Sequence, residues 1–122
     1  MQTILVIEDE RGILDNVIEI LNFEDFNAIP AVDGKMGVEL AQQHLPDLIL
    51  CDLRMPVLDG YGVVRALRSH PDTADLPLII MTAKAYDVEE AFVKEMNVAY
   101  CLKKPFHAVE LLEAVEAHIR KP

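Results

Sequence analysis

The feature that most constrains the fold is an alternation of short apolar runs with segments of helical period. The apolar runs are rich in Ile, Val and Leu, and they lie at Ile4–Ile7, Ala28–Val32, Leu48–Cys51, Leu78–Met81 and around Val98–Leu102. The first and third runs are apolar at consecutive positions, which is typical of strands buried on both faces. This pattern predicts strands of a parallel sheet.

Apolar residues at helical spacing fill the intervals between these runs. The five stripes are Ile13, Val17, Ile20 and Leu21; Met36, Leu40 and Ala41; Val63, Val64 and Leu67; Val88, Ala91, Phe92 and Met96; and Val109, Leu112, Val115, Ala117 and Ile119. Asp33-Gly34 marks the start of the second helix, and Pro46 and Pro71 follow the ends of the second and third. Five βα units in a row predict an α/β fold with helices on both faces of the sheet.

Length and composition predict one soluble domain spanning residues 1–122. Hydrophobic residues make up 52% of the chain, which argues against disorder. The apolar runs are far shorter than the ~20 residues that a bilayer requires. Acidic residues at Glu8–Glu10 interrupt the first run, so no secretory signal is recognisable. We therefore expect a cytoplasmic protein that makes no contact with a membrane.

The net charge of −10 opposes direct binding to nucleic acid, because a phosphate backbone requires clustered Lys and Arg. It permits a basic protein partner, or a divalent cation where acids converge. Cys51 and Cys101 lie within apolar runs, so we expect reduced core thiols. The histidines are scattered near expected helix ends, and we expect surface positions for His44, His70, His107 and His118.

Polar residues follow the predicted strands at the points where they end. Glu8-Asp9-Glu10 follows the first strand, Asp52 the third, Thr82 the fourth and Lys103-Lys104-Pro105 the fifth. Ligands of open α/β sheets bind outside the carboxyl ends of the strands. If the first, third, fourth and fifth strands are neighbours, one crevice collects Asp9, Asp52, Thr82 and Lys104.

Such a set of side chains suits phosphoryl chemistry. Crowded carboxylates repel one another, and Mg²⁺ with oxygen ligands compensates them. A lysine and a hydroxyl suit phosphoryl oxygens, and a carboxylate can itself be the nucleophile that forms an aspartyl-phosphate. Taken singly, Asp52 or Thr82 fits a cap or turn, Lys104 fits the surface, and the acids after the first strand fit a helix start. Their placement at successive strand ends favours the phosphoryl site.

Four motifs closely resemble the receiver domain of two-component response regulators, over essentially the whole chain. They are "ILVIEDE" at 4–10, "DLILCDLRMPVLDG" at 47–60, "MTAK" at 81–84 and "KKPF" at 103–106. The resemblance implies a flavodoxin-like sheet of order 2-1-3-4-5. It also implies that Asp52 accepts a phosphoryl group from a histidine kinase or a phosphotransfer protein.

The same resemblance implies the other roles in the site. Asp9, Asp52 and the backbone carbonyl of Arg54 would bind Mg²⁺, with Glu8 supporting the metal through water. Lys104 would contact the phosphoryl oxygens, and the Lys104–Pro105 bond is usually cis in the family. Thr82 would move towards the phosphoryl group and carry the signal to the surface of the fourth helix, fifth strand and fifth helix.

The sequence departs from the family in its fifth strand. An aromatic residue usually lies three positions before the Lys of the Lys-Pro pair, and here that position is Cys101, with Tyr100 one residue earlier. A shift of one residue moves a side chain to the other face of a strand. Either Cys101 occupies the switch position, which we favour, or a bulge restores Tyr100 to it.

The sequence therefore predicts a single-domain response regulator that changes its affinity for a downstream protein when Asp52 is phosphorylated. It would catalyse at most its own phosphorylation and dephosphorylation, and so is not expected to be an enzyme. One alternative is a receiver-like interaction module that acts without phosphate. Another is a phosphatase with an aspartyl-phosphate intermediate, but such an enzyme would carry an acid two residues after the nucleophile, where this chain has Arg54.

Overall fold

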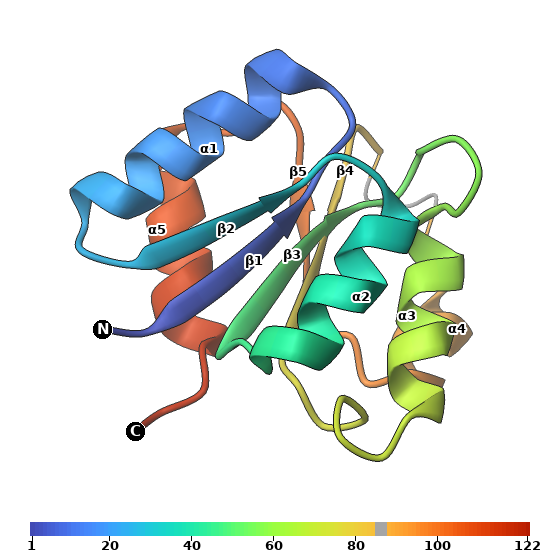
Figure 1. Ribbon diagram of the computed structural model, residues 1–122. Coiled ribbons are helices and arrows are strands. Elements are labelled where there is room, and N and C mark those ends of the chain that lie inside the picture. The colour runs from blue at the N-terminus through green and yellow to red at the C-terminus, as the bar shows by residue number, and fades with distance from the viewer. Residues whose placement is uncertain (85–87) are drawn as a thin grey trace.

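The computed structural model describes residues 1–84 and 88–122, in which strands and helices alternate (Figure 1). The strands are β1 (Thr3–Ile7), β2 (Asn27–Ala31), β3 (Leu48–Asp52), β4 (Leu78–Thr82) and β5 (Tyr100–Lys103). The helices are α1 (Arg11–Phe23), α2 (Gly34–His44), α3 (Gly60–Ser69), α4 (Glu90–Glu95) and α5 (Ala108–His118). The predicted succession of βα units is confirmed.

The strands form a parallel sheet of order β2-β1-β3-β4-β5, which confirms the predicted flavodoxin-like arrangement. The chain passes from β1 to β2 on one side and then to β3 on the other, so the strand order reverses between β1 and β3. Ile7 pairs with Cys51 in this register. The residues that follow them, Glu8 and Asp52, are therefore brought together at the crevice where such folds bind ligands.

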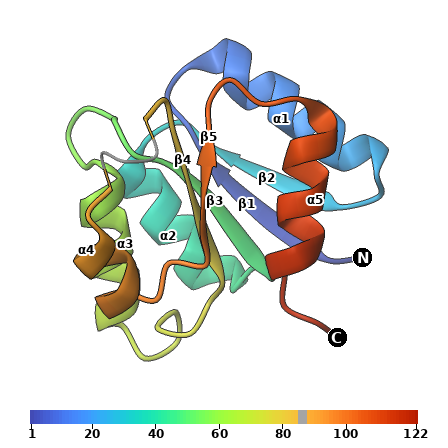
Figure 2. The ribbon, with the colours of Figure 1, turned by 180° about the vertical axis from the view of Figure 1, so that it is seen from behind.

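Helices cover both faces of the sheet, with α1 and α5 on one side and α2, α3 and α4 on the other (Figures 1 and 2). Side chains alternate between the two cores along each strand, as the pleat requires. In β3, Leu48 and Leu50 face α1 and α5, whereas Ile49 and Cys51 face the opposite core. All five residues of β3 and of β4 are buried, which explains their continuous apolar sequences.

Aspartate side chains cap the two helices that follow β2 and β3. The side chain of Asp33 accepts a hydrogen bond from Met36 N at 2.8 Å, and that of Asp59 accepts one from Gly62 N at 2.9 Å. These bonds satisfy backbone donors that have no partner within the first helical turn. The Asp-Gly pairs in the sequence are therefore helix starts.

Three details of the sequence prediction were wrong. The fifth strand begins at Tyr100. Val98 instead lies in the turn that follows α4, where its N–H donates to Val93 O at 2.9 Å. In α5 the buried residues are Leu111, Ala114 and Val115, while Val109 is 65% exposed. The actual stripe is shifted along the helix because α5 covers the sheet edge at β5 and leaves its first turn in solvent. Ala91 and Ala117 are also exposed.

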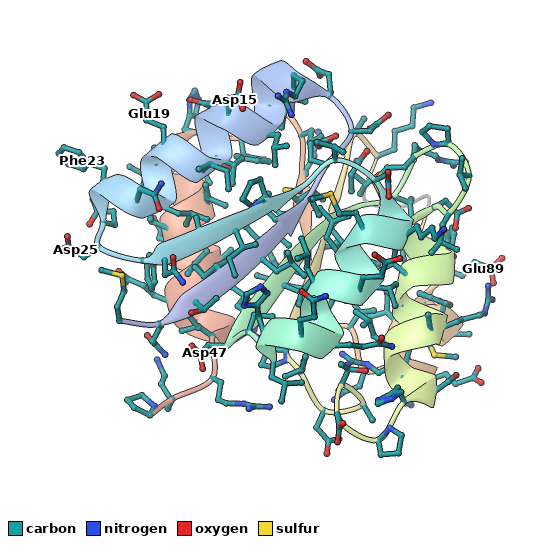
Figure 3. All side chains as sticks on the ribbon, in the orientation of Figure 1. Asp15, Glu19, Phe23, Asp25, Asp47 and Glu89 are labelled. Atoms are coloured by element: carbon teal, nitrogen blue, oxygen red, sulfur yellow. The ribbon has the colours of Figure 1, made fainter. Side chains whose placement is uncertain are left out.

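The acidic surface includes α1, where Asp15 and Glu19 point outward beside the exposed ring of Phe23 (Figure 3). In the described part of the chain, none of the helices has the length and apolar character needed to cross a bilayer.

Candidate functional site

Lys104 connects two acids at the carboxyl edge of the sheet. Its Nζ lies 2.5 Å from Glu8 Oε1 and 2.9 Å from Asp52 Oδ1. The three side chains come from the ends of β1, β3 and β5, which the topology places around the crevice. One ammonium group thus compensates two carboxylates that would otherwise repel each other.

The two acids are enclosed to different degrees. The side chain of Glu8 is 1% exposed, and its second oxygen, Oε2, accepts a hydrogen bond from Glu10 N at 3.2 Å. The side chain of Asp52 is 9% exposed, and Lys104 contacts one of its oxygens. Asp52 is therefore held in place by a charge-assisted bond while part of its carboxylate reaches solvent.

The electrostatics of the cluster follow from burial and pairing. Burial raises the pKa of Glu8, and the nearby charge of Asp52 raises it further, although Lys104 acts in the opposite sense. Burial lowers the pKa of Lys104, but its hydrogen bonds to Glu8 and Asp52 outweigh this effect and raise the pKa above the ordinary lysine value. Lys104 is thus firmly charged, whereas Glu8 is a carboxylate under electrostatic strain.

Asp9 adds a third acid beside this pair. Glu8, Asp9 and Asp52 each offer a carboxylate oxygen, and these oxygens lie within 4.8 Å of one another. Asp9 is exposed, so a cation could approach from solvent. Hard carboxylate oxygens with an open solvent side match the ligand preference of Mg²⁺, which keeps several of its waters. The residues present therefore fit the metal that the sequence predicts.

Thr82 is the last residue of β4, and its side chain faces the opposite side of the sheet from that of Met81. It is 3% exposed, and its hydroxyl lies 3.3 Å from Lys84 N, which donates to it. The same oxygen is 3.4 Å from Lys84 O. The Thr82 side chain is thus engaged with its own loop, while the Thr82 backbone carbonyl accepts a hydrogen bond from Lys104 N at 2.8 Å.

The register of β5 has no bulge between Tyr100 and Lys103. Cys101 pairs with Ile80 and packs against the core under α4, on the same side of the sheet as Thr82. Tyr100 lies on the other side, where its ring stacks on that of His118 at 5.4 Å between centroids. His118 is therefore half-buried rather than a simple surface residue, contrary to the sequence prediction. Both cysteines are free thiols, and burial raises the pKa of each.

Comparison with known proteins identifies the family. Residues 4–116 match the response regulator receiver domain. The chain belongs to this family. Curated relatives include the DNA-binding dual master transcriptional regulator RpaA of Synechocystis, 36% identical over 121 residues, and the transcriptional regulatory protein CpxR of Escherichia coli K12, 32% identical over 121 residues. Both alignments cover 99% of this chain and 50% of the relative, so this receiver domain spans about half the length of those proteins.

Solved structures share the fold closely. The chemotaxis protein CheY4 of Vibrio cholerae superposes with a TM-score of 0.90 at 26% identity, over 96% of this chain and 98% of that one. The receiver domain of the sensor histidine kinase PA1611 of Pseudomonas aeruginosa gives 0.86 at 29% identity, with 95% of each chain covered. A magnesium ion is coordinated in the active-site cleft of that protein. Receiver domains are signalling modules, and this membership implies a role in phosphorelay signalling.

The structure places most of the residues singled out in the sequence at the carboxyl edge of the sheet. The side chains of Glu8, Asp9, Asp52 and Lys104 form one cluster, and Thr82 at the neighbouring strand end joins it through the backbone bond from Lys104 N. Arg54 is exposed in the loop after β3, and the peptide bond between Lys104 and Pro105 is cis. Sequence reasoning did not anticipate that Glu8 binds Lys104 directly.

Proposed function

We propose that Asp52 accepts a phosphoryl group and that this receiver domain thereby switches its affinity for a partner protein. The observation that carries the proposal is a carboxylate at the tip of a fully buried strand, fixed by Lys104 beside two further acids. A rigid strand suits a nucleophile because it fixes the angle of attack. A histidine kinase or a phosphotransfer protein in the cytoplasm would be the donor.

In the transfer step, the solvent-facing oxygen of Asp52 attacks the phosphorus. A P–O bond forms while the bond from phosphorus to the imidazole nitrogen of the donor breaks, and the electron pair leaves with that nitrogen. Lys104 already contacts Asp52 Oδ1 at 2.9 Å, so its ammonium group lies where a phosphoryl oxygen would develop charge. The side chain of Lys104 would follow the new charge from the carboxylate to the phosphoryl group.

Asp9, Asp52 and the carbonyl of Arg54 would hold Mg²⁺, and Glu8 would support it from behind. When bound, the cation would supply neutralising charge to the phosphoryl oxygens. Glu8 would then serve two purposes, because its Oε1 also contacts Lys104 at 2.5 Å. Its carboxylate keeps the ammonium group within the cleft in the resting state.

Output would pass through Thr82 and the α4–β5–α5 surface. Cys101 is small and faces the core on the Thr82 side, so Thr82 could move without displacing a large ring. Phosphorylation would therefore be weakly coupled to β5. We expect Cys101→Tyr to make partner binding more phosphate-dependent and Cys101→Ala to change it little. An effect of Tyr100→Ala on this coupling, with Cys101→Ala silent, would contradict the assignment.

Incubation with acetyl phosphate and Mg²⁺, followed by intact mass measurement, tests the proposal. The wild-type chain should gain one phosphoryl group, and Asp52→Asn should gain none. Asp47→Asn is the matched control, because Asp47 lies beside the other end of the same strand. Equal labelling of the Asp52→Asn chain would refute the proposal. An unlabelled wild-type chain that still binds a partner would favour the phosphate-independent module instead.

A further inference from the structure

Val57 has a backbone conformation that its side chain disfavours. Its φ is 71°, in the left-handed region where a β-branched residue is an outlier. The N–H of Leu58 donates to Pro56 O at 2.8 Å across Val57, which closes a tight γ-turn. Asn or Gly would accept this conformation with less strain.

Burial of the side chain does not compensate for this strain. The side chain of Val57 is 96% exposed, the highest value among the large hydrophobic residues that the structure describes. Its neighbours behave differently, since Met55 is buried and Leu58 packs against the core under α2 and α3. The residue is therefore strained and apolar, and it contributes no burial to the fold. Strained residues of this kind cluster at functional sites.

The loop that carries Val57 begins and ends next to Asp52. Gly60 N donates to Leu53 O at 2.8 Å, so the segment 53–60 returns to the residue that follows Asp52. A Cβ at Gly34 would lie 2.3 Å from Leu58 O, which shows how tightly α2 packs against the loop just after Val57. The backbone that carries Val57 is thus held in the loop next to Asp52, and an ordered loop loses little entropy when a partner covers it.

We infer that Val57 is a recognition residue for the protein that donates the phosphoryl group. This inference rests on the proposed function of Asp52. A donor protein must bring its phosphorylated side chain to a carboxylate that is 9% exposed, and so must contact the rim around it. An apolar patch on the donor would bury the Val57 side chain. A small phosphodonor enters the cleft without needing this contact.

The experiment compares phosphorylation from two kinds of donor. The protein probe is an autophosphorylated histidine phosphotransfer domain, selected beforehand from a panel as the fastest donor to the wild-type chain, and the small probe is acetyl phosphate with Mg²⁺. Val57→Asn should lower the second-order rate of transfer from the protein about tenfold, because a buried apolar contact is lost. The rate with acetyl phosphate should stay unchanged. Val57→Met keeps an apolar side chain and should transfer at close to the wild-type rate.

Leu45→Asn is the matched control. Leu45 also has positive φ, 44°, and is 45% exposed, but it ends α2 at the opposite edge of the sheet. Leu45→Asn should leave both rates unchanged. A protein-donor rate unaffected by Val57→Asn would overturn the inference, and so would an equal loss with acetyl phosphate, which would assign Val57 to the chemistry of the cleft. Failure of the proposed function would be separate, because it would appear as labelling of Asp52→Asn.

Discussion

The two edges of the sheet use half-buried cations in different ways. At the carboxyl edge, Lys104 contacts the carboxylates of Glu8 and Asp52. At the amino edge, the guanidinium of Arg68 donates to five backbone carbonyls: Met96 O at 2.8 Å, Asn97 O at 3.2 Å, Thr73 O at 3.3 Å, Ala74 O at 3.0 Å and Leu76 O at 2.8 Å. Arg68 thereby joins the end of α3, the α3–β4 loop and the end of α4 (Figure 1).

The difference separates stability from function. Carbonyl oxygens are neutral and fixed, so the bonds of Arg68 have no reason to change during signalling. Burial lowers the pKa of Arg68 while Asp75 raises it, and the group remains charged in any ordinary solution. The carboxylates around Lys104 are crowded and partly open to solvent, and in the proposed function they would exchange the lysine for a metal or a phosphoryl group. Variants at the two edges should therefore behave differently.

The largest effect on stability is expected from Arg68→Met. The variant leaves several carbonyls without a donor at a half-buried position, and we expect a loss of about 3 kcal/mol in the free energy of unfolding. Chemical denaturation measures this loss. The folded fraction should still take one phosphoryl group from acetyl phosphate. Arg68→Lys should recover a small part of the stability, because an ammonium group has three donors and no planar fork. A variant as stable as the wild type would show that solvent replaces the guanidinium.

Lys104→Met should cost less stability and much more function. Glu8 and Asp52 would lose their shared cation, and we expect a loss of about 2 kcal/mol at neutral pH. The pKa of Glu8 is already raised, so its ionised form costs folding energy above that pKa and its protonated form does not. The loss should therefore shrink as the pH falls below neutrality, since Glu8 takes up a proton more readily in the folded state than in the unfolded one. Denaturation at several pH values tests this, and a loss that grows on acidification would contradict it.

The residues on which these two predictions rest were not equally visible in the sequence. Asp52 ends a strand of continuous apolar sequence and Lys104 directly follows β5, so the expected strand order predicts that they meet. Arg68 lies on the polar side of an amphipathic helix, where an arginine ordinarily faces solvent. Its carbonyl partners come from two separate segments, and no local pattern reveals them.

The same reasoning explains the errors in the fold. The strands β1, β3 and β4 were predicted well because strands buried on both faces are apolar at every position. Val98 was assigned to the fifth strand because it is apolar, but it is buried in the turn that follows α4. The positive φ of Val57 could not be predicted, because nothing in a Pro-Val-Leu sequence requires it. Position within the tertiary structure decides each of these cases.

Asp9→Asn should have a smaller and opposite effect on stability. Removing one of three crowded charges should raise the stability of the metal-free protein by roughly 1 kcal/mol. The wild-type protein should gain about 2.7 kcal/mol from Mg²⁺ at a hundred times its dissociation constant, and the variant should lose most of this gain. Thermal melts with and without Mg²⁺ measure both quantities. An unchanged response to Mg²⁺ in Asp9→Asn would exclude Asp9 as a ligand.

The smallest effect is expected from Asp47→Asn, which compares two acids beside the same strand. Asp47 lies at the amino edge, away from the cleft (Figure 3), and its Oδ2 accepts a hydrogen bond from Thr3 N at 2.8 Å. An asparagine oxygen can accept the same bond, so only the benefit of charge is lost, and we expect a change of about 0.5 kcal/mol. The response to Mg²⁺ and the uptake of a phosphoryl group should match the wild type. Asp52→Asn, by contrast, should abolish that uptake and, because it relieves repulsion with Glu8, keep or raise the stability of the metal-free protein. If Asp47→Asn weakened the response to Mg²⁺, the two edges would be coupled through β3, and the separation of stability from function would fail.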